Sequence, residues 1–195
     1  MIRLITLGFL LMLNSLTVQA QTSSEPNLKI VESSQEETVN SQQGHMPMTP
    51  ETMASIVRAI DPQANVQGNA MQLTIQGVEI TIVTDPKNNR MRAFSAFKTL
   101  DGVDGQALYR MMQANFDSAL DARYAIAKGY VISVFIHPLG ELQKEQFIQG
   151  LGQVTNLVLT FGTAYTSGAM TFGGGDSQNL HRQLIDELLK KGEEI

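Results

Sequence analysis

The side chains best suited to metal chemistry in this sequence are three histidines, His45, His137 and His181. A zinc site needs three or four donors that converge on one point. No second ligand stands at metal-site spacing from any of them, and the chain contains no cysteine. His137 follows an apolar run, where a histidine usually makes a structural hydrogen bond. We therefore expect no metal site and no cofactor.

Two pairs of carboxylates, Asp101 with Asp104 and Asp117 with Asp121, are the candidates for acid–base catalysis. Such catalysis uses two carboxyl groups that face one cleft in different environments. All four aspartates fall in turns that flank one predicted helix, where aspartate commonly caps the backbone. Either Asp101 or Asp104 can cap that helix, so capping explains these positions without a catalytic role.

Two further stretches contain residue types found in phosphate-binding loops and serine hydrolases. The glycines at 173–175 are followed by Asp176, follow no predicted strand and lack the lysine of a GxxxxGK[ST] loop. The stretch 165–168, Tyr-Thr-Ser-Gly, has neither a GxSxG context nor a local base. No catalytic constellation emerges, and we expect a protein that is not an enzyme.

The first twenty residues are typical of a secretory signal peptide. Arg3 is followed by an apolar run at 4–13, and Val18 and Ala20 occupy the small-residue positions of a cleavage site. An uncleaved anchor is disfavoured because the polar residues 14–15 end the run short of the about 20 residues that span a bilayer. We expect an exported protein, periplasmic or secreted, with no membrane insertion after cleavage.

Charge argues against a nucleic-acid partner. The formal net charge is −5, and it becomes −6 when Arg3 leaves with the leader. Phosphate binding needs a cationic surface, and the only adjacent basic pair, Lys190 with Lys191, falls in the last turn of a predicted helix, where it offsets the helix dipole.

The mature chain divides into a spacer, a domain and a tail. Residues 21–48 are rich in Ser, Gln and Glu and poor in large apolar residues, which predicts a disordered spacer. Residues 49–168 form the predicted domain. Residues 169–195 comprise a glycine-rich joint and an amphipathic helix, which either docks on the same core, the favoured interpretation, or serves as an arm for a partner.

The pattern of apolar residues predicts an α+β domain in the order α-βββ-α-ββ-α, with a five-stranded antiparallel sheet. A helix starts at Pro50 after the N-cap Thr49 and ends before Pro62. The other predicted elements are strands within 70–83 on either side of Gln76-Gly77, a strand at 90–98, a helix around 108–116, strands at 122–127 and 130–137, and a helix at about 141–165.

The stretch from 108 to 139 is the predicted centre of the domain. Its helix carries an apolar stripe at three- and four-residue intervals, which faces either the sheet or a partner. The hairpin that follows contains Tyr124 and Ile126 in its first strand. Its second strand, 130–137, is apolar on both faces, which is typical of a strand inside a sheet.

The stretch ALYRMMQAN at 107–115, followed by Phe116, the hairpin 122–136 and a Pro-Leu pair, resembles the type III secretion chaperone-like superfamily, including its YbjN-like sensory-transduction regulator family. The resemblance covers about 49–168. The resemblance implies a non-enzymatic domain that often forms a homodimer. It also implies that those relatives which are chaperones hold a client as an extended segment against the sheet. Chaperones of this kind act in the cytoplasm, whereas this chain carries an export signal.

We therefore expect a homodimer that binds an envelope protein or a peptide client as a chaperone or adaptor. The predicted dimer or partner contact comprises Leu108, Met111, Met112, Asn115, Phe116, Tyr124 and Ile126. The alternative is a carrier of a small apolar ligand. In that hypothesis Gly150 and Gly152, which have no side chains, leave an apolar cavity between the helix at 141–165 and the sheet.

Overall fold

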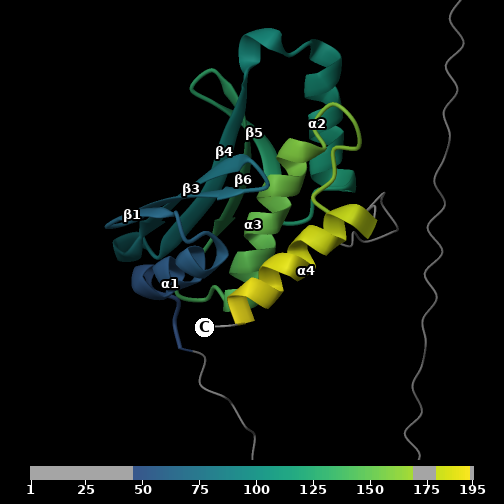
Figure 1. Ribbon diagram of the computed structural model, residues 1–195. Helices are drawn as coiled ribbons and strands as arrows, with labels where there is room; N and C mark the ends of the chain where they lie inside the picture. The colour runs from purple at the N-terminus through teal and green to yellow at the C-terminus, as the bar shows by residue number, and fades with distance from the viewer. Residues whose placement is uncertain (1–45, 169–178, 194–195) are drawn as a thin grey trace, which may run out of the picture. The chain divides into compact units, whose positions relative to one another are not determined.

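The computed structural model describes residues 46–168 and 179–193 (Figure 1). The predicted signal peptide, residues 21–45 of the predicted spacer and the predicted joint at 169–178 lie outside these residues. The elements are α1 (Pro50–Ile60), β1 (Asn65–Gln67), β2 (Ala70–Ile75), β3 (Val78–Asp85), the 3-10 turn η1 (Pro86–Asn88), β4 (Arg90–Thr99), the 3-10 turn η2 (Leu100–Gly102), α2 (Gly105–Asp117), β5 (Arg123–Ala127), β6 (Tyr130–His137), α3 (Lys144–Leu159) and α4 (Asn179–Glu193).

The sheet runs in the order β1-β2-β3-β4-β6-β5, and every neighbouring pair is antiparallel. The predicted α+β class is confirmed, but the sheet in the described residues has six strands rather than five. The additional strand is β1, whose sequence Asn-Val-Gln has a single apolar residue and therefore shows no alternation. After β4 the chain passes through α2, enters β5 at the edge and returns as β6 between β4 and β5.

Two predicted hairpins are confirmed in detail. Gln76 and Gly77 have φ values of 48° and 77°, and Lys128 and Gly129 have 50° and 79°. Positive φ at both central residues is the geometry of a type I′ turn, whose twist matches that of the strands. These turns fix the register that places alternate apolar residues of β2, β3, β5 and β6 on one face of the sheet.

The helices cover only one face of the sheet in the described part of the chain (Figure 1). Strand residues facing the helices are buried, while their neighbours on the other face are mostly exposed or half-buried. The burial of alternate residues in β2 and β3 shows this directly. The buried face includes Met71, Leu73, Ile80, Ile82, Met91, Ala93, Val131 and Phe135.

The central helix α3 packs closely on β6. A Cβ atom added to Gly150 would lie 2.6 Å from the Phe135 ring, and the Ser133 hydroxyl donates to the Val154 carbonyl at 2.9 Å. The helix is shorter than the predicted 141–165. It begins after Gln143, whose N–H donates to the side chain of Gln146, and it ends at Leu159.

Beyond α3 the backbone reverses, with φ values of 81° at Gly162 and 53° at Tyr165. The heptad spacing that suggested a longer helix continues into this turn, where Phe161 and Tyr165 pack against other aromatic rings. The apolar spacing therefore predicted correctly that these residues pack inside the protein, but it placed the end of the helix too late in the sequence.

The C-terminal helix α4 docks on α3, which confirms the favoured interpretation of the tail. Leu184, Ile185 and Leu188 are buried. A Cβ atom on Gly152 of α3 would lie 2.7 Å from the Ile185 side chain. The missing side chain at Gly152 thus lets the two helices approach each other.

Candidate protein-binding surface

The helix α2 lies over the β5 edge of the sheet and is buried along one side only. Its N-terminus is capped by Asp104 rather than Asp101, because the Asp104 carboxylate accepts a hydrogen bond from the Ala107 N–H at 2.7 Å. Met111 and Ala114 are buried beneath it. Leu108 is partly buried against the same core, whereas Met112 and Phe116 of the apolar stripe are exposed.

The outer side of α2 presents three large apolar side chains. Tyr109, Met112 and Phe116 are 64%, 65% and 91% exposed. Their spacing of three and four residues places them on one face of the helix. Single exposed apolar residues are common, whereas neighbouring ones that form a patch are less so. This row is therefore the candidate contact surface on α2.

A side-chain amide fastens α2 to the edge strand. The Asn115 amide donates to the Tyr124 carbonyl at 3.0 Å, and the Tyr124 N–H donates to the Asn115 side-chain oxygen at 2.7 Å. This pair of bonds imitates the pairing of a neighbouring strand and occupies the outer edge of β5 at that residue. By alternation, the peptide groups of Ile126 point to the same outer edge.

Buried hydroxyl groups tie the end of α2 to the turn after α3. The Ser118 hydroxyl donates to the Tyr165 carbonyl at 2.6 Å. The Ser167 hydroxyl accepts from the Leu120 N–H at 3.2 Å, and the Ser167 N–H donates to the Ser118 carbonyl at 3.2 Å. Both serines are buried, so α2 is held in place from below at its C-terminal end.

Gln153 is a buried residue that the sequence analysis missed. Its side-chain oxygen accepts from the N–H groups of Asp121 and Ala122 at 2.9 and 3.0 Å, and its amide donates to the Asp121 carboxylate at 3.0 Å. It therefore joins α3 to the start of β5. A glutamine off the apolar seam of a helix gives no sign of such a role in the sequence.

An aromatic cluster lies beneath α2. The rings of Phe97, Tyr124, Phe161 and Tyr165 meet with centroid distances of 5.2 to 6.4 Å, and the Arg110 guanidinium lies 5.4 Å from the Tyr165 ring. The Tyr124 hydroxyl donates to the Leu157 carbonyl at 2.6 Å. Burial, which disfavours the charged phenolate, raises the pKa of Tyr124.

The structure separates the predicted contact residues into two groups. Met111 and Tyr124 are buried, and Leu108 and Asn115 are half-buried. Met112, Phe116 and Ile126 are exposed, and Tyr109 joins them although the sequence analysis did not select it. Direct contact with a partner falls mainly to the exposed group, and that contact stays a prediction.

A second apolar surface, also missed from the sequence, lies on the open face of the sheet. Val83 of β3 and Ile136 of β6 are 43% and 53% exposed, and both pair across Arg92 of β4. In the next row Phe94 pairs with Val134. A shallow depression follows these residues.

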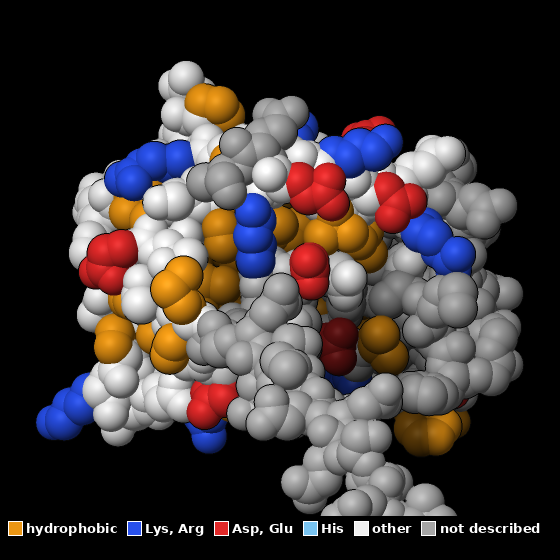
Figure 2. Space-filling view, turned by 90° about the horizontal axis from the view of Figure 1, so that it is seen from below, with side chains coloured by type: hydrophobic (Ala, Val, Ile, Leu, Met, Phe, Trp, Pro, Cys, Tyr) orange, Lys and Arg blue, Asp and Glu red, His pale blue; other side chains and the backbone are white. Residues whose placement is uncertain are grey.

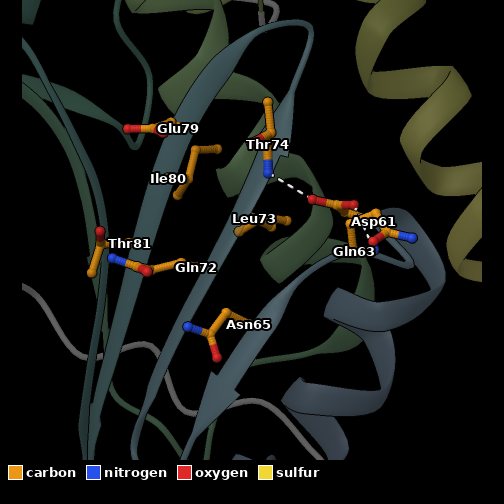
Figure 3. Close-up of a pocket in the computed structure, with 9 residues that line it drawn as sticks. All are labelled: Asp61, Gln63, Asn65, Gln72, Leu73, Thr74, Glu79, Ile80 and Thr81. Carbon is orange, nitrogen blue, oxygen red and sulfur yellow. Dashed lines mark hydrogen bonds between the residues drawn. The ribbon is translucent and has the colours of Figure 1, made fainter.

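The β1 end of the same open face is polar. Figure 3 shows the side chains that line a depression there, among them Gln72 and Thr81. The Asp61 carboxylate accepts from the N–H groups of Gln63 and Thr74 at 2.9 and 2.8 Å. Thr74 lies on β2 past the last residue that pairs with β1. The Asp61 carboxylate therefore satisfies a backbone N–H at the edge of the sheet opposite β5.

The residues first considered for chemistry do not converge within the described part of the chain. The His137 ring stacks on Phe135, and its Nδ1 atom lies 2.8 Å from the Pro138 carbonyl. His45 and the side chain of His181 lie outside the described residues. Within these limits, no three His, Asp or Glu side chains are placed to hold a metal ion.

Figure 2 shows one face, on which Lys or Arg side chains alternate with Asp or Glu around hydrophobic ones, without a continuous basic patch. Among the described helices, none combines the length and the apolar character that crossing a bilayer requires.

The class that these elements define is an α+β domain with helices on one face of an antiparallel sheet. No family model matches the chain, and no curated protein matches it. The chain is similar to the type III secretion chaperone SycH of Yersinia pestis, solved with a stable fragment of YscM2. The alignment covers 55% of this chain and 97% of that one, with 16% identity and a TM-score of 0.43.

A second similar structure is a chain of the HopA1–SchA chaperone–effector complex. It aligns over 56% of this chain and 92% of its own length, with 8% identity and a TM-score of 0.44. Both solved structures are thus partly similar to this chain in fold, over little more than half of its length.

Proposed function

We propose that this protein is a non-enzymatic protein-binding domain that forms a homodimer through α2. The observation that carries the proposal is the row of Tyr109, Met112 and Phe116 on the outer side of this helix. The helix is held by Asn115 and by the buried serines at its end. Because the helix is already fixed in position, its backbone need not be ordered on binding, which favours association.

A second copy fits this surface because the row contains no charge. In a two-fold symmetric contact the same patch of both copies meets, so the patch must be complementary to itself. An uncharged apolar row on a helix satisfies that condition by packing against its own copy. Ile126, half exposed on the adjoining strand β5, extends the surface.

The finer function that we propose is that of a chaperone or adaptor for a polypeptide in the cell envelope. The leader at 1–20 supports export, and the apolar surfaces on α2 and on the open face of the sheet support binding of protein. The motif at 107–115 supports membership of the YbjN-like family. The client itself is an envelope protein or a peptide.

The alternative function, carriage of a small apolar ligand under α3, is disfavoured by the packing. The space beside Gly150 is filled by the Phe135 ring, and the space beside Gly152 is filled by Ile185 of α4. These two glycines permit close contacts between elements and leave no cavity at either residue.

The test is the oligomeric state of the mature protein with Met112→Glu and with Phe116→Glu, measured by sedimentation equilibrium. We expect the native protein to be a dimer and both variants to be monomers, because each buries an unpaired carboxylate in the contact. Ser55→Glu places the same charge on the exposed side of α1 and should leave the dimer intact. A dimer that persists in both α2 variants would remove the assignment.

A further inference from the structure

We infer that the open face of β4 and β6 binds an acidic amphipathic helix of a partner polypeptide. The inference rests on the proposed protein-binding function and names the chemistry of the partner. It uses a different surface from the α2 row, so the two can be tested separately.

The first argument is the composition of β6. Its residues on the helix side are buried against α3, yet its residues on the other face are also apolar: Tyr130, Ile132, Val134 and Ile136. A strand that is apolar on both faces is typical of a sheet covered on both sides. Within the described residues the helices cover only one side. On the other side Tyr130 and Ile136 remain 45% and 53% exposed, while Val134 between them is 8% exposed.

The second argument is charge. Arg90 and Arg92 of β4 are exposed on this open face beside Val83, Phe94 and Ile136. Neither arginine forms a salt bridge within the described part of the chain. The protein as a whole is acidic, so two arginines beside an apolar strip are a local exception to its net charge.

Two neighbouring charged side chains on this face, Asp85 and Arg123, make hydrogen bonds of their own. The Asp85 carboxylate, paired across the sheet with Arg90, accepts hydrogen bonds from the Asn88 side chain and backbone, at 2.6 and 3.1 Å, and these bonds lower the pKa of that carboxyl. The Arg123 guanidinium of β5 donates to the carbonyls of Ala119, Leu120 and Ala122. Asp85 remains an anion across from Arg90, and the charge of Arg90 also acts on the Glu141 carboxylate. Arg92, whose cross-strand neighbours Val83 and Ile136 are apolar, is therefore the cation available to a partner, which must bring a carboxylate.

The third argument selects a helix over an extended segment. In the middle of a sheet the peptide groups of β4 and β6 are paired with their neighbours, so the face offers no backbone partners. A strand laid on this face would leave its own N–H and C=O groups unpaired as the contact excludes water. A helix satisfies its backbone internally and can bury one apolar stripe.

The dimensions agree with that choice. The eight residues of β6 extend over about 26 Å at about 3.3 Å per residue. A helix of about 18 residues, at about 1.5 Å per residue, has the same length. Acidic residues beside its apolar stripe would then face Arg92, near one end of the strip.

The probe is a fluorescent peptide of about 18 residues with leucine along one helical face and glutamate on its flanks. A matched peptide carries lysine in place of glutamate. Binding is measured by fluorescence anisotropy with the full mature protein at low salt, where exposed charges act most strongly. We expect the glutamate peptide to bind about fivefold more tightly than the lysine peptide.

Two substitutions locate the site. Arg92→Glu should reverse the preference, so that the lysine peptide binds more tightly, and Ile136→Glu should weaken both peptides about tenfold. Arg58→Glu on the exposed side of α1 makes the same charge change on the covered side of the sheet and should change neither affinity by more than about twofold. Unchanged thermal unfolding of each variant shows that its fold is intact.

Three outcomes would overturn the inference. The first is equal binding of the two peptides by the native protein. The second is an unchanged preference in Arg92→Glu. The third is dissociation of the dimer by Ile136→Glu with Phe116→Glu still dimeric, because a second copy would then occupy the open face. If Phe116→Glu still binds the glutamate peptide, the peptide does not use the α2 row. That result supports binding at the open face of the sheet, whether or not the variant is a dimer.

Discussion

The two faces of the sheet differ in what covers them and in what their residues do. On the covered face Phe135 fills the space beside Gly150, and the Ser133 hydroxyl reaches the backbone of α3. On the open face Val83 and Ile136 lie beside Arg92 with no described element above them. The same strand β6 supplies residues to both faces.

This difference separates stability from recognition. Residues of the covered face lose contacts and leave cavities when they are truncated, so they set the free energy of unfolding. Residues of the open face have few contacts to lose, and their substitution changes affinity for a partner. Matched substitutions on the two faces test that separation, because the chain offers the same residue types on each.

The largest expected effect comes from the two phenylalanines. Phe135→Ala should lower the free energy of unfolding by about 3 to 4 kcal/mol, because it leaves a cavity against Gly150. Phe94→Ala, on the half-buried open face, should cost about 1 kcal/mol. Urea unfolding followed by circular dichroism measures both. Equal losses would show that the open face is packed as tightly as the covered one.

A smaller effect is expected from a polar residue on the covered side. Gln153→Leu leaves the N–H groups of Asp121 and Ala122 without their acceptor, which should cost about 2 to 3 kcal/mol. Gln149→Leu, on the exposed side of the same helix, should change stability by less than about 0.5 kcal/mol. If both variants unfold at the same urea concentration, Gln153 does not hold β5 to α3.

The sequence predicted well those features that depend on local rules. The hairpin at Gln76-Gly77 requires positive φ, and the cap at Thr49 requires a side-chain oxygen, which accepts from the Thr52 N–H. Both requirements are visible in single residues and their neighbours. Alternation in β2 and β3 likewise identified the buried face.

Features that depend on distant contacts could not be predicted. Met111 and Met112 belong to one apolar stripe in the sequence, yet one is buried and the other is exposed, because the position of β5 decides which side of α2 is inside. The role of Gln153 depends on residues more than thirty positions away. The strand β1 has too few apolar residues to be recognised.

The same comparison can be made with two tyrosines, and here the expected effect is smallest. Tyr124 on the covered side donates to the carbonyl of Leu157, one of the last four carbonyls of α3, which no later residue of the helix can satisfy. Tyr124→Phe should therefore cost about 1 kcal/mol at neutral pH. Tyr130→Phe, on the open face, should cost nothing measurable.

The pH dependence distinguishes loss of the Tyr124 hydroxyl from a general loosening of the fold. Burial raises the pKa of Tyr124 in the folded protein above its unfolded value of about 10. The folded state then binds the phenolic proton more tightly than the unfolded state, so this contribution is fully present below about pH 10 and is lost as the pH rises further. The native protein and Tyr130→Phe should both lose stability steeply in that range, whereas Tyr124→Phe should lose less. Urea midpoints measured from pH 8 to beyond pH 10 give the slopes, and identical slopes for all three proteins would show that Tyr124 does not carry the effect.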